Sequence, residues 1–479
     1  MAGTTYGKII MAPSPAATRT GAPERGLEAR RMDAGSVRRA DAENVWHHLT
    51  RHGGKPGPVM VRGEGLRLWD LDGKEYLDAT SGGVWCVNVG YGRREIAERV
   101  AAQLVKMPYY VGSAGNEPAA EFSERLLGHA PGLSRLYFSS SGSEANEKAY
   151  KMTRLLASLS GRGGAAILYR DRDYHGTTLG ALSTSGQSER KEGFGPFVPG
   201  FEELPAAHCY RCPFGLRRGS CSLECARAAG EAIDRLGEGR VAGAVFETVT
   251  AGGGVIVPPD GYWQEVAGIL KRRGVLLILD EVVTGMGRTG KMFAFEHYGV
   301  TPDMATLAKG VASAYMPVSV TLTTEEVFRG LQEGEGALGY FRDISTFGGS
   351  AAAAAAADEN LAIIEREGLV ERAREMGGEL LDALKASLAH PNVGDVRGLG
   401  LLCGVELVKS KEGREPLPEE GAMAVVARMA ELGVLAGRTN RSIPGGNNVI
   451  NFAPAFTVSR DEVEEIRRAL VRALSDVLG

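Results

Sequence analysis

The sequence predicts an α/β fold with a mostly parallel central sheet, and three segments carry this prediction. The uninterrupted apolar run from Val275 to Leu279 is typical of a strand that is buried on both faces. A second short apolar run covers Met304 to Ala308. A third strand begins at Leu136 and leads through a Ser-Gly-Ser turn into a segment with helical spacing of apolar residues. Strands that lead into helices in this way indicate layered α/β architecture.

Charged residues stand where two of these strands end. Asp280 and Glu281 follow the first run, and Lys309 follows the second. Open α/β sheets bind their ligands at the carboxyl ends of strands, and a lysine is seldom found there without a reason. Pyridoxal phosphate needs a lysine amine that reacts with its aldehyde and an aspartate that keeps its pyridine nitrogen protonated. The alternatives are a structural ion pair for Asp280 and a solvated amine for Lys309.

These residues lie in the segments L-D-E-V-V-T-G-M-G-R-T-G and T-L-A-K-G, which resemble the class III aminotransferases. This family includes the ω-amino acid–pyruvate transaminases, and the resemblance covers roughly residues 42 to 479. It implies the fold of the fold-type-I transferases and pyridoxal 5′-phosphate as cofactor. It also implies that Asp280 pairs with the pyridine nitrogen, that Lys309 bonds to the cofactor, and that Val282 packs against its ring.

A competing motif occupies the same stretch. Gly285 to Gly290 read G-M-G-R-T-G, which matches the dinucleotide-binding pattern. That fingerprint needs a helix that opens at the glycines and an acidic residue about twenty positions further on. Asp303 comes too early for this and follows Pro302 in a loop. A nucleotide-binding oxidoreductase is therefore the distant alternative.

Composition excludes several classes of protein. The chain has 479 residues, of which 43% are hydrophobic and 24% are charged, and its net charge is −4. This balance gives no electrostatic reason to expect nucleic acid or an acidic membrane as a partner. No apolar run reaches the roughly 18 to 20 residues of a membrane span, and no signal peptide pattern opens the sequence. We therefore expect a cytoplasmic protein.

The chain is long enough for two or three lobes. We expect a mobile tail over residues 1–40, the N-terminal segment of a small domain over 41–84, a large cofactor-binding domain over 85–350, and the rest of the small domain over 351–479. A helix is predicted from Asn44, and an Asp-Gly turn after Gly65 predicts a hairpin. Further along, Arg397 to Leu407 is strand-like, and a capping box at Ser459 predicts a helix.

The Ser-Gly-Ser turn is a candidate phosphate cradle. The free amides at a helix start, aided by the helix dipole and by serine hydroxyls, bind anions. The same residues would also serve as a plain serine N-cap. In the family this turn binds the cofactor phosphate, which implies that role for Gly142 and Ser143, with Ser141 adjacent.

Two further residues are implied to surround the cofactor ring. The family carries Y-H-G at Tyr174, whose aromatic face stacks on the ring, and His175 is then only a neighbour. Glu247 ends another apolar strand and is expected to orient groups near the cofactor, although a solvated strand-end acid fits almost as well. Thr248 departs from the proline that the family usually has there.

The resemblance also implies a homodimer with active sites shared between the subunits. In the family, the threonine that matches Thr346 reaches the cofactor phosphate of the neighbouring subunit. The histidine–proline pair that usually follows is replaced here by Gly349 and Ser350.

Candidate substrate residues are less sharply defined. The family implies that Trp85 lines the substrate pocket, together with Tyr174, and Tyr110 is a weaker candidate for the same wall. Relatives place an arginine near Arg438 that holds the carboxylate of the acceptor, with Arg441 in reserve. A core tryptophan and a surface arginine are the alternatives.

Four cysteines lie close together in the sequence. Cys209, Cys212, Cys221 and Cys225 follow a C-x-x-C and C-x-x-x-C pattern, which would suit a tetrahedral zinc site. Free buried thiols explain the pattern equally, and the family needs no metal, so we assign none. The insertion resembles the taurine–pyruvate branch of the family.

These observations predict an aminotransferase that moves the amino group of a primary amine, expected to be an ω-amine, to a keto acid, expected to be pyruvate, by ping-pong kinetics. The amine and the keto acid are the expected small-molecule partners. A biosynthetic aminotransferase that aminates an aldehyde or ketone is the closer alternative. A zinc-stabilised binding protein built around Cys209 to Cys225 is a third hypothesis.

Overall fold

A computed structural model describes residues 32–49, 57–336, 339–438 and 441–479. The chain divides into two compact units, Met1–Val59 and Met60–Gly479. In the first unit the structure describes one helix, α1 (Ala34–Asn44). Asp33 caps its start, because the Asp33 side chain accepts a hydrogen bond from Ser36 N.

The position of α1 corrects the sequence prediction. A helix was predicted to start at Asn44, but α1 ends there, and Val45 has an extended backbone. The cap at Asp33 fixes the start of the helix, and the β-branched Val45 and the aromatic Trp46 after Asn44 are weaker helix formers. Part of α1 therefore lies in the segment predicted as a tail, whose residues 1–31 are outside the described residues.

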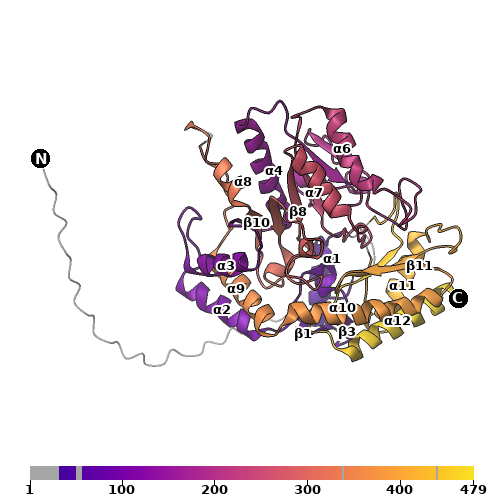
Figure 1. Ribbon diagram of the computed structural model, residues 1–479. Coiled ribbons are helices and arrows are strands. Elements are labelled where there is room, and N and C mark those ends of the chain that lie inside the picture. The colour runs from indigo at the N-terminus through magenta and orange to yellow at the C-terminus, as the bar shows by residue number, and fades with distance from the viewer. Residues whose placement is uncertain (1–31, 50–56, 337–338, 439–440) are drawn as a thin grey trace, which may run out of the picture. The chain divides into compact units, whose positions relative to one another are not determined.

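A seven-stranded sheet forms the centre of the second unit (Figure 1). Its strand order is β4-β10-β9-β8-β7-β5-β6. The strands are β4 (Arg135–Ser139), β5 (Ala166–Arg170), β6 (Phe201–Leu204), β7 (Val241–Glu247), β8 (Leu276–Asp280), β9 (Met304–Leu307) and β10 (Ser319–Thr323). All neighbours from β6 to β9 pair in parallel, and only β10 runs antiparallel to its neighbours. The predicted α/β fold with a mostly parallel sheet is confirmed.

Helices cover this sheet and extend away from it. They are α2 (Arg94–Lys106), α3 (Glu117–Gly128), α4 (Gly142–Leu159), α5 (Leu179–Ser183), α6 (Glu224–Leu236), α7 (Tyr262–Arg272), α8 (Glu325–Gly330) and α9 (Ala351–Arg366). Helix α4 packs against β7, β8, β9 and β10, and α9 packs against α2 and α3. The alanine run at the start of α9 is fully buried, so its small side chains allow close helix packing.

Two smaller four-stranded sheets complete the second unit. One has the order β1-β2-β3-β13, with β1 (Met60–Glu64), β2 (Arg67–Asp70), β3 (Glu75–Asp78) and β13 (Val434–Leu435). The antiparallel pairing of β2 with β3 confirms the predicted hairpin. The parallel pairing of β3 with β13 joins the N-terminal strands to the C-terminal part of the chain. The predicted domain boundaries at 85 and 351 stay predictions.

The other small sheet has the order β11-β12-β15-β14, with β11 (Val393–Gly398), β12 (Cys403–Leu407), β14 (Gly437–Arg438) and β15 (Val449–Phe452). The strand predicted from Arg397 to Leu407 is therefore a hairpin of two strands. Gly400, with φ of +57°, supplies the left-handed backbone of the turn.

Three helices accompany this sheet, α10 (Leu369–Lys385), α11 (Glu419–Glu431) and α12 (Arg460–Leu478). Figure 1 shows α10 and α12 side by side, and the two helices are in contact. The capping box predicted at Ser459 is present at the start of α12 and includes Glu462. Among the helices that the structure describes, none is both long and apolar enough to span a membrane.

The G-M-G-R-T-G segment forms turns and opens no helix, as predicted. Its Arg288 is fully buried and holds separate parts of the second unit together. Nη1 donates to Leu401 O at 3.1 Å and to Pro454 O at 2.6 Å. Nη2 donates to Ser81 Oγ at 3.1 Å and to Asn88 Oδ1 at 2.6 Å. The guanidinium thus satisfies four acceptors that come from three distant segments.

The substitution Arg288→Met is expected to lower the free energy of unfolding by roughly 2–4 kcal/mol, because the apolar chain fills the space but leaves buried acceptors without a donor. Urea unfolding followed by tryptophan fluorescence measures the change. Arg272→Met, at an exposed position on α7, is the control and should shift stability by less than about 0.5 kcal/mol. Equal midpoints for the two variants would contradict this role.

Candidate active site

The carboxyl edge of the central sheet gathers the charged residues that the sequence singled out. Strands β7, β8 and β9 are neighbours, with Glu247 opposite Asp280 and Asp280 opposite Thr306. Lys309 follows three residues after Thr306 and so lies beyond the same edge. These strands are built from buried apolar residues, so their polar residues come at the point where each strand leaves the core.

Asp280 is only 3% exposed and is held by three hydrogen bonds. Its Oδ2 accepts from Asn146 Nδ2 at 2.8 Å and shares a hydrogen bond of 2.8 Å with His175 Nδ1. Its Oδ1 accepts from Val282 N at 3.0 Å. The carboxylate is therefore fixed in orientation.

Two of these partners differ from the sequence interpretation. His175 was treated only as a neighbour of Tyr174, yet it bonds directly to Asp280. Asn146 was not singled out at all. It lies in α4, where Oδ1 accepts from Thr306 Oγ1 at 2.9 Å, so it links the helix to both strands. The sequence signal that could have identified Asn146 is a polar residue beside Ala145, on the helix face that packs against the sheet.

Glu247 is 4% exposed and positions the loop that carries Tyr174. Its Oε1 accepts from Tyr174 N at 2.8 Å and its Oε2 accepts from Ala251 N at 2.9 Å. Burial raises the pKa of Glu247, and the nearby carboxylates of Asp173 and Asp280 raise it further. Glu247 thus acts on Tyr174 through the backbone.

Lys309 has a left-handed backbone, with φ of +46°. Its Nζ donates to Val84 O at 3.0 Å and lies 5.0 Å from the centre of the Trp85 ring. Trp85 also has positive φ, +65°, and its Nε1 donates to Asn451 Oδ1 at 2.9 Å. Such a backbone is strained for residues other than glycine and is found often at functional sites. The structure therefore brings Trp85 and Lys309 together, and the role of Trp85 in a substrate pocket stays a prediction.

The Ser-Gly-Ser turn starts α4 at the same edge. Ser141 caps the helix, because its Oγ accepts from Glu144 N at 3.3 Å. The amides of Gly142 and Ser143 come first in the helix and have no acceptor within it. A Cβ atom at Gly142 would lie 3.1 Å from Val282 Cγ1, so the glycine allows the helix start and Val282 to approach closely.

Tyr110 and Thr346 are exposed and lie on neighbouring segments. The rings of Tyr109 and Phe347 are 5.7 Å apart, and Asn116 Nδ2 donates to Gly349 O at 2.9 Å. No hydrogen bond or ring contact joins Tyr110 or Thr346 to Asp280 or Lys309 within the described residues. The two residues thus lie at the surface of the chain.

The two candidate arginines share one partner. Glu419 in α11 pairs with Arg438 Nη1 at 3.0 Å and with Arg441 Nη1 at 3.3 Å. The backbone carbonyl of Arg441 also accepts from Arg172 Nη1 at 2.9 Å, close to the loop that carries Tyr174. The assignment of the carboxylate to Arg438, with Arg441 in reserve, stays a prediction.

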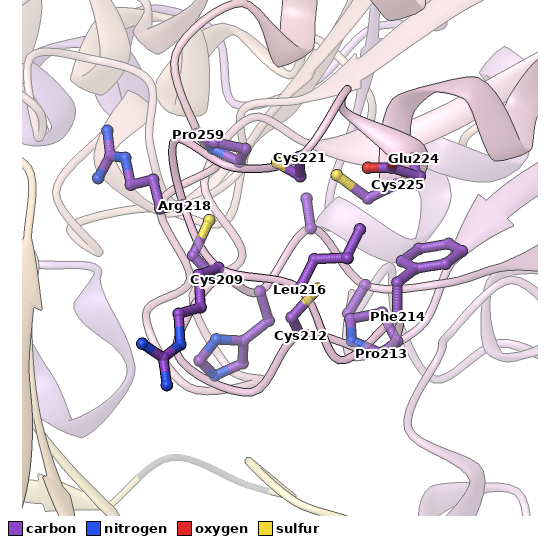
Figure 2. Close-up of a pocket in the computed structure, with 14 residues that line it drawn as sticks. Cys209, Cys212, Pro213, Phe214, Leu216, Arg218, Cys221, Glu224, Cys225 and Pro259 are labelled. Carbon is purple, nitrogen blue, oxygen red and sulfur yellow. The ribbon is translucent and has the colours of Figure 1, made fainter.

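The four clustered cysteines line a small separate pocket (Figure 2). Phe214, Leu216 and Pro259 lie beside them. In the part of the chain that the structure describes, no three His, Cys, Asp or Glu side chains are arranged to hold a metal ion. Burial raises the pKa of Cys209, and it raises the pKa of Cys225 to about 11, so both are neutral thiols at pH 7.

Comparisons with known proteins identify the family of the chain. A model of the family "Aminotransferase class-III" matches residues 50–474. The taurine–pyruvate aminotransferase of Rhodobacter capsulatus is 50% identical, over 92% of this chain and 97% of that relative. The hypotaurine/taurine–pyruvate aminotransferase of Paracoccus denitrificans is 48% identical, over 95% of this chain and 100% of that relative.

A solved structure of a Bacillus anthracis aminotransferase superposes with a TM-score of 0.89 at 38% identity and covers 92% of this chain and 98% of its own. Both the sequence match and the fold thus extend over nearly the whole protein. The chain belongs to the class III aminotransferases.

Proposed function

We propose that this aminotransferase moves the amino group of a short ω-amino acid, taurine in the first place, to pyruvate, with pyridoxal 5′-phosphate as its cofactor. The names of the two relatives described above support the two substrates, since both names include taurine and pyruvate. The geometry around Asp280 is the observation that supports pyridoxal 5′-phosphate as the cofactor.

The residues present fit this cofactor. Asp280 is a buried carboxylate with no lysine or arginine within 4.0 Å in the described residues, so a protonated pyridine nitrogen would supply the missing positive charge. The free amides of Gly142 and Ser143 suit its phosphate, with Ser141 beside them. When bound, the cofactor supplies an electron sink for the carbon that carries the amino group.

Each protein residue then has a limited task. Lys309 would hold the cofactor through its amine, and the same amine would move a proton at the substrate carbon. Asn146 and His175 fix the orientation of the Asp280 carboxylate, which would pair with the ring nitrogen. Tyr174 and Val282 are proposed to contact the faces of the ring, and Glu247 holds Tyr174 in place.

A panel of amines tests this function. Taurine, β-alanine and an α-amino acid are each paired with pyruvate and with 2-oxoglutarate, and transfer is measured by product analysis. Taurine with pyruvate is expected to give the highest kcat/KM. Amination of aldehydes with no transfer from taurine or β-alanine would instead support the biosynthetic alternative. A purified protein without the yellow colour of the cofactor, and without activity, would contradict the proposal.

We also propose a homodimer in which Thr346 completes the phosphate site of the partner subunit. Thr346 is exposed between Ile344 and Phe347, which are 74% and 65% exposed, and Tyr110 on the adjoining segment is 64% exposed. Large apolar side chains gathered in this way favour contact with another protein surface. A second copy of the chain would bury them and bring a hydroxyl to the phosphate.

Mixed dimers test whether the two subunits share their active sites. Thr346→Asp should weaken cofactor binding at least about tenfold, because the new carboxylate repels the phosphate. When Thr346→Asp subunits are refolded or co-expressed with Lys309→Ala subunits, one site in each heterodimer keeps both native residues. Activity should then exceed the sum of the two homodimers. Simple additivity, in a preparation that size-exclusion chromatography shows to be mixed, would rule out shared sites.

A further inference from the structure

Helix α4 carries three charged residues to which the proposed chemistry gives no task. Glu144, Lys148 and Lys151 are spaced four and three residues apart, so they lie on one face of the helix. Lys148 is only 8% exposed, and a lysine is seldom buried without a partner. The partners of this charged face lie in the segment that carries Thr346.

Two side chains of that segment bind the charged face. Lys148 Nζ donates to Asp343 Oδ1 at 2.6 Å, and Lys151 Nζ donates to Asp343 Oδ2. Ser345 Oγ donates to Glu144 Oε2 at 2.9 Å. The segment therefore follows the charged face of α4 back toward the start of the helix.

Asp343 makes the strongest of these attachments. Its side chain is 3% exposed. Burial opposes the charge of Asp343, but the hydrogen bonds from Lys148 and Lys151 outweigh this effect and lower the pKa of the carboxyl. Tyr137 Oη also donates to Asp343 O at 2.9 Å. Because a buried ion pair is costly to break by removing one partner, Asp343 fixes the segment firmly to α4.

The side chains between these attachments face the other way. Arg342, Ile344 and Thr346 are all exposed. After Thr346 the chain turns, and Gly348 N donates to Ser345 O at 3.0 Å. A Cβ atom at Gly348 would lie 2.6 Å from the carbonyl oxygen of residue 138 in β4, so the turn packs closely on the sheet. Thr346 is thus fixed on both sides while its own side chain stays exposed.

We propose that Asp343 is a positioning residue, which holds Thr346 where it can reach the cofactor phosphate of a partner subunit. This inference rests on the proposed homodimer, because Thr346 acts across the subunit interface. The same helix begins with the amides of Gly142 and Ser143, which are proposed to bind the phosphate of their own subunit. Helix α4 would therefore support one phosphate directly and the other through Asp343.

Loss of cofactor from the loaded enzyme tests this role. The enzyme is dialysed against cofactor-free buffer, samples are reduced with borohydride, and mass spectrometry follows the labelled peptide that contains residue 309. Asp343→Asn should lose the cofactor about three- to tenfold faster than wild type, because Thr346 keeps its hydroxyl but is held less firmly. Ser345→Ala, which removes the second attachment, should act in the same direction.

The matched control is Asp382→Asn, at a position on α10 whose side chain is 76% exposed. It should lose the cofactor at the wild-type rate, because an exposed ion pair contributes little. A wild-type rate in Asp343→Asn as well would overturn the proposal.

Mixed dimers show on which subunit Asp343 acts. Asp343→Asn and Lys309→Ala subunits carry different affinity tags, and the heterodimer is purified through both. Only the site with Lys309 can be labelled, and this site receives Thr346 from the subunit that keeps Asp343. Its rate of cofactor loss should return to the wild-type value. If the rate stayed as fast as in the Asp343→Asn homodimer, Asp343 would support its own subunit and the proposal would be wrong.

Failure of this inference can be told from failure of the proposed function. If the Thr346→Asp mixed dimers show shared sites but Asp343→Asn is not rescued, only the role of Asp343 is refuted. If wild type takes up no cofactor, the proposed function fails. Hydrogen–deuterium exchange over residues 341–349 would still test the attachment, since these amides should exchange at least about threefold faster in Asp343→Asn. Unchanged exchange would overturn it.

Discussion

Lys309→Ala is expected to lower kcat for transfer from taurine to pyruvate by about 10⁴-fold or more, because the substitution removes both the amine that bonds to the cofactor and the base that moves the proton. Lys309 has a strained backbone, and its Nζ donates to Val84 O and lies within 4.0 Å of no carboxylate in the described residues. This leaves the amine available for reaction.

Borohydride reduction of the cofactor-loaded enzyme identifies the residue independently of activity. Mass spectrometry should find the added cofactor mass on the peptide that contains residue 309 in wild type, and no such peptide in Lys309→Ala. Lys291→Ala, an exposed lysine on the same stretch, is the matched control and should keep both the label and the activity. A label found elsewhere in wild type would refute the assignment.

The strand ends could be predicted from sequence because their signals are local. Short apolar runs in β8 and β9 stop abruptly at Asp280 and before Lys309, and a parallel sheet places such ends at one edge. The hairpin of β2 and β3 and the capping box of α12 depend on residues that are close in the chain. Local patterns of this kind can be recognised in the sequence without knowledge of the fold.

Partners that are distant in the sequence could not be predicted in the same way. Asn146 and His175 reach Asp280 only because α4 and the loop after β5 pack against the end of β8. The family resemblance predicted the cofactor, but no rule of sequence spacing predicts these side-chain contacts to Asp280.

The exposure of the residues around Thr346 could not be predicted from the sequence for a different reason. A threonine, an isoleucine and a phenylalanine in sequence carry no signal for exposure, and β-branched or aromatic residues normally suggest a buried strand. The fold leaves Ile344 and Phe347 largely exposed, next to the equally exposed Tyr110. The site predicted from one chain is therefore expected to be complete only when a second copy is present.

Asp280→Asn is expected to lower kcat by about 10³-fold, because a neutral amide cannot hold the pyridine nitrogen in its protonated form, and the electron sink is weakened at the step that removes the proton. The side chain keeps its size, and its Oδ1 can still accept from Val282 N. The amide group, however, sets a donor against the donor Asn146 Nδ2, so the orientation of residue 280 is also loosened.

Asp303→Asn is the matched control, because it makes the same substitution at the opposite end of the same strands. Asp303 precedes β9, and its Oδ2 accepts from Leu277 N at 2.7 Å, near the amino end of β8. Turnover of Asp303→Asn should stay within about twofold of wild type, since no reacting group lies at that edge. With taurine deuterated at the amine-bearing carbon, only Asp280→Asn should show a larger isotope effect than wild type. Equal losses in the two variants would mean that Asp280 supports the strand and not the ring nitrogen.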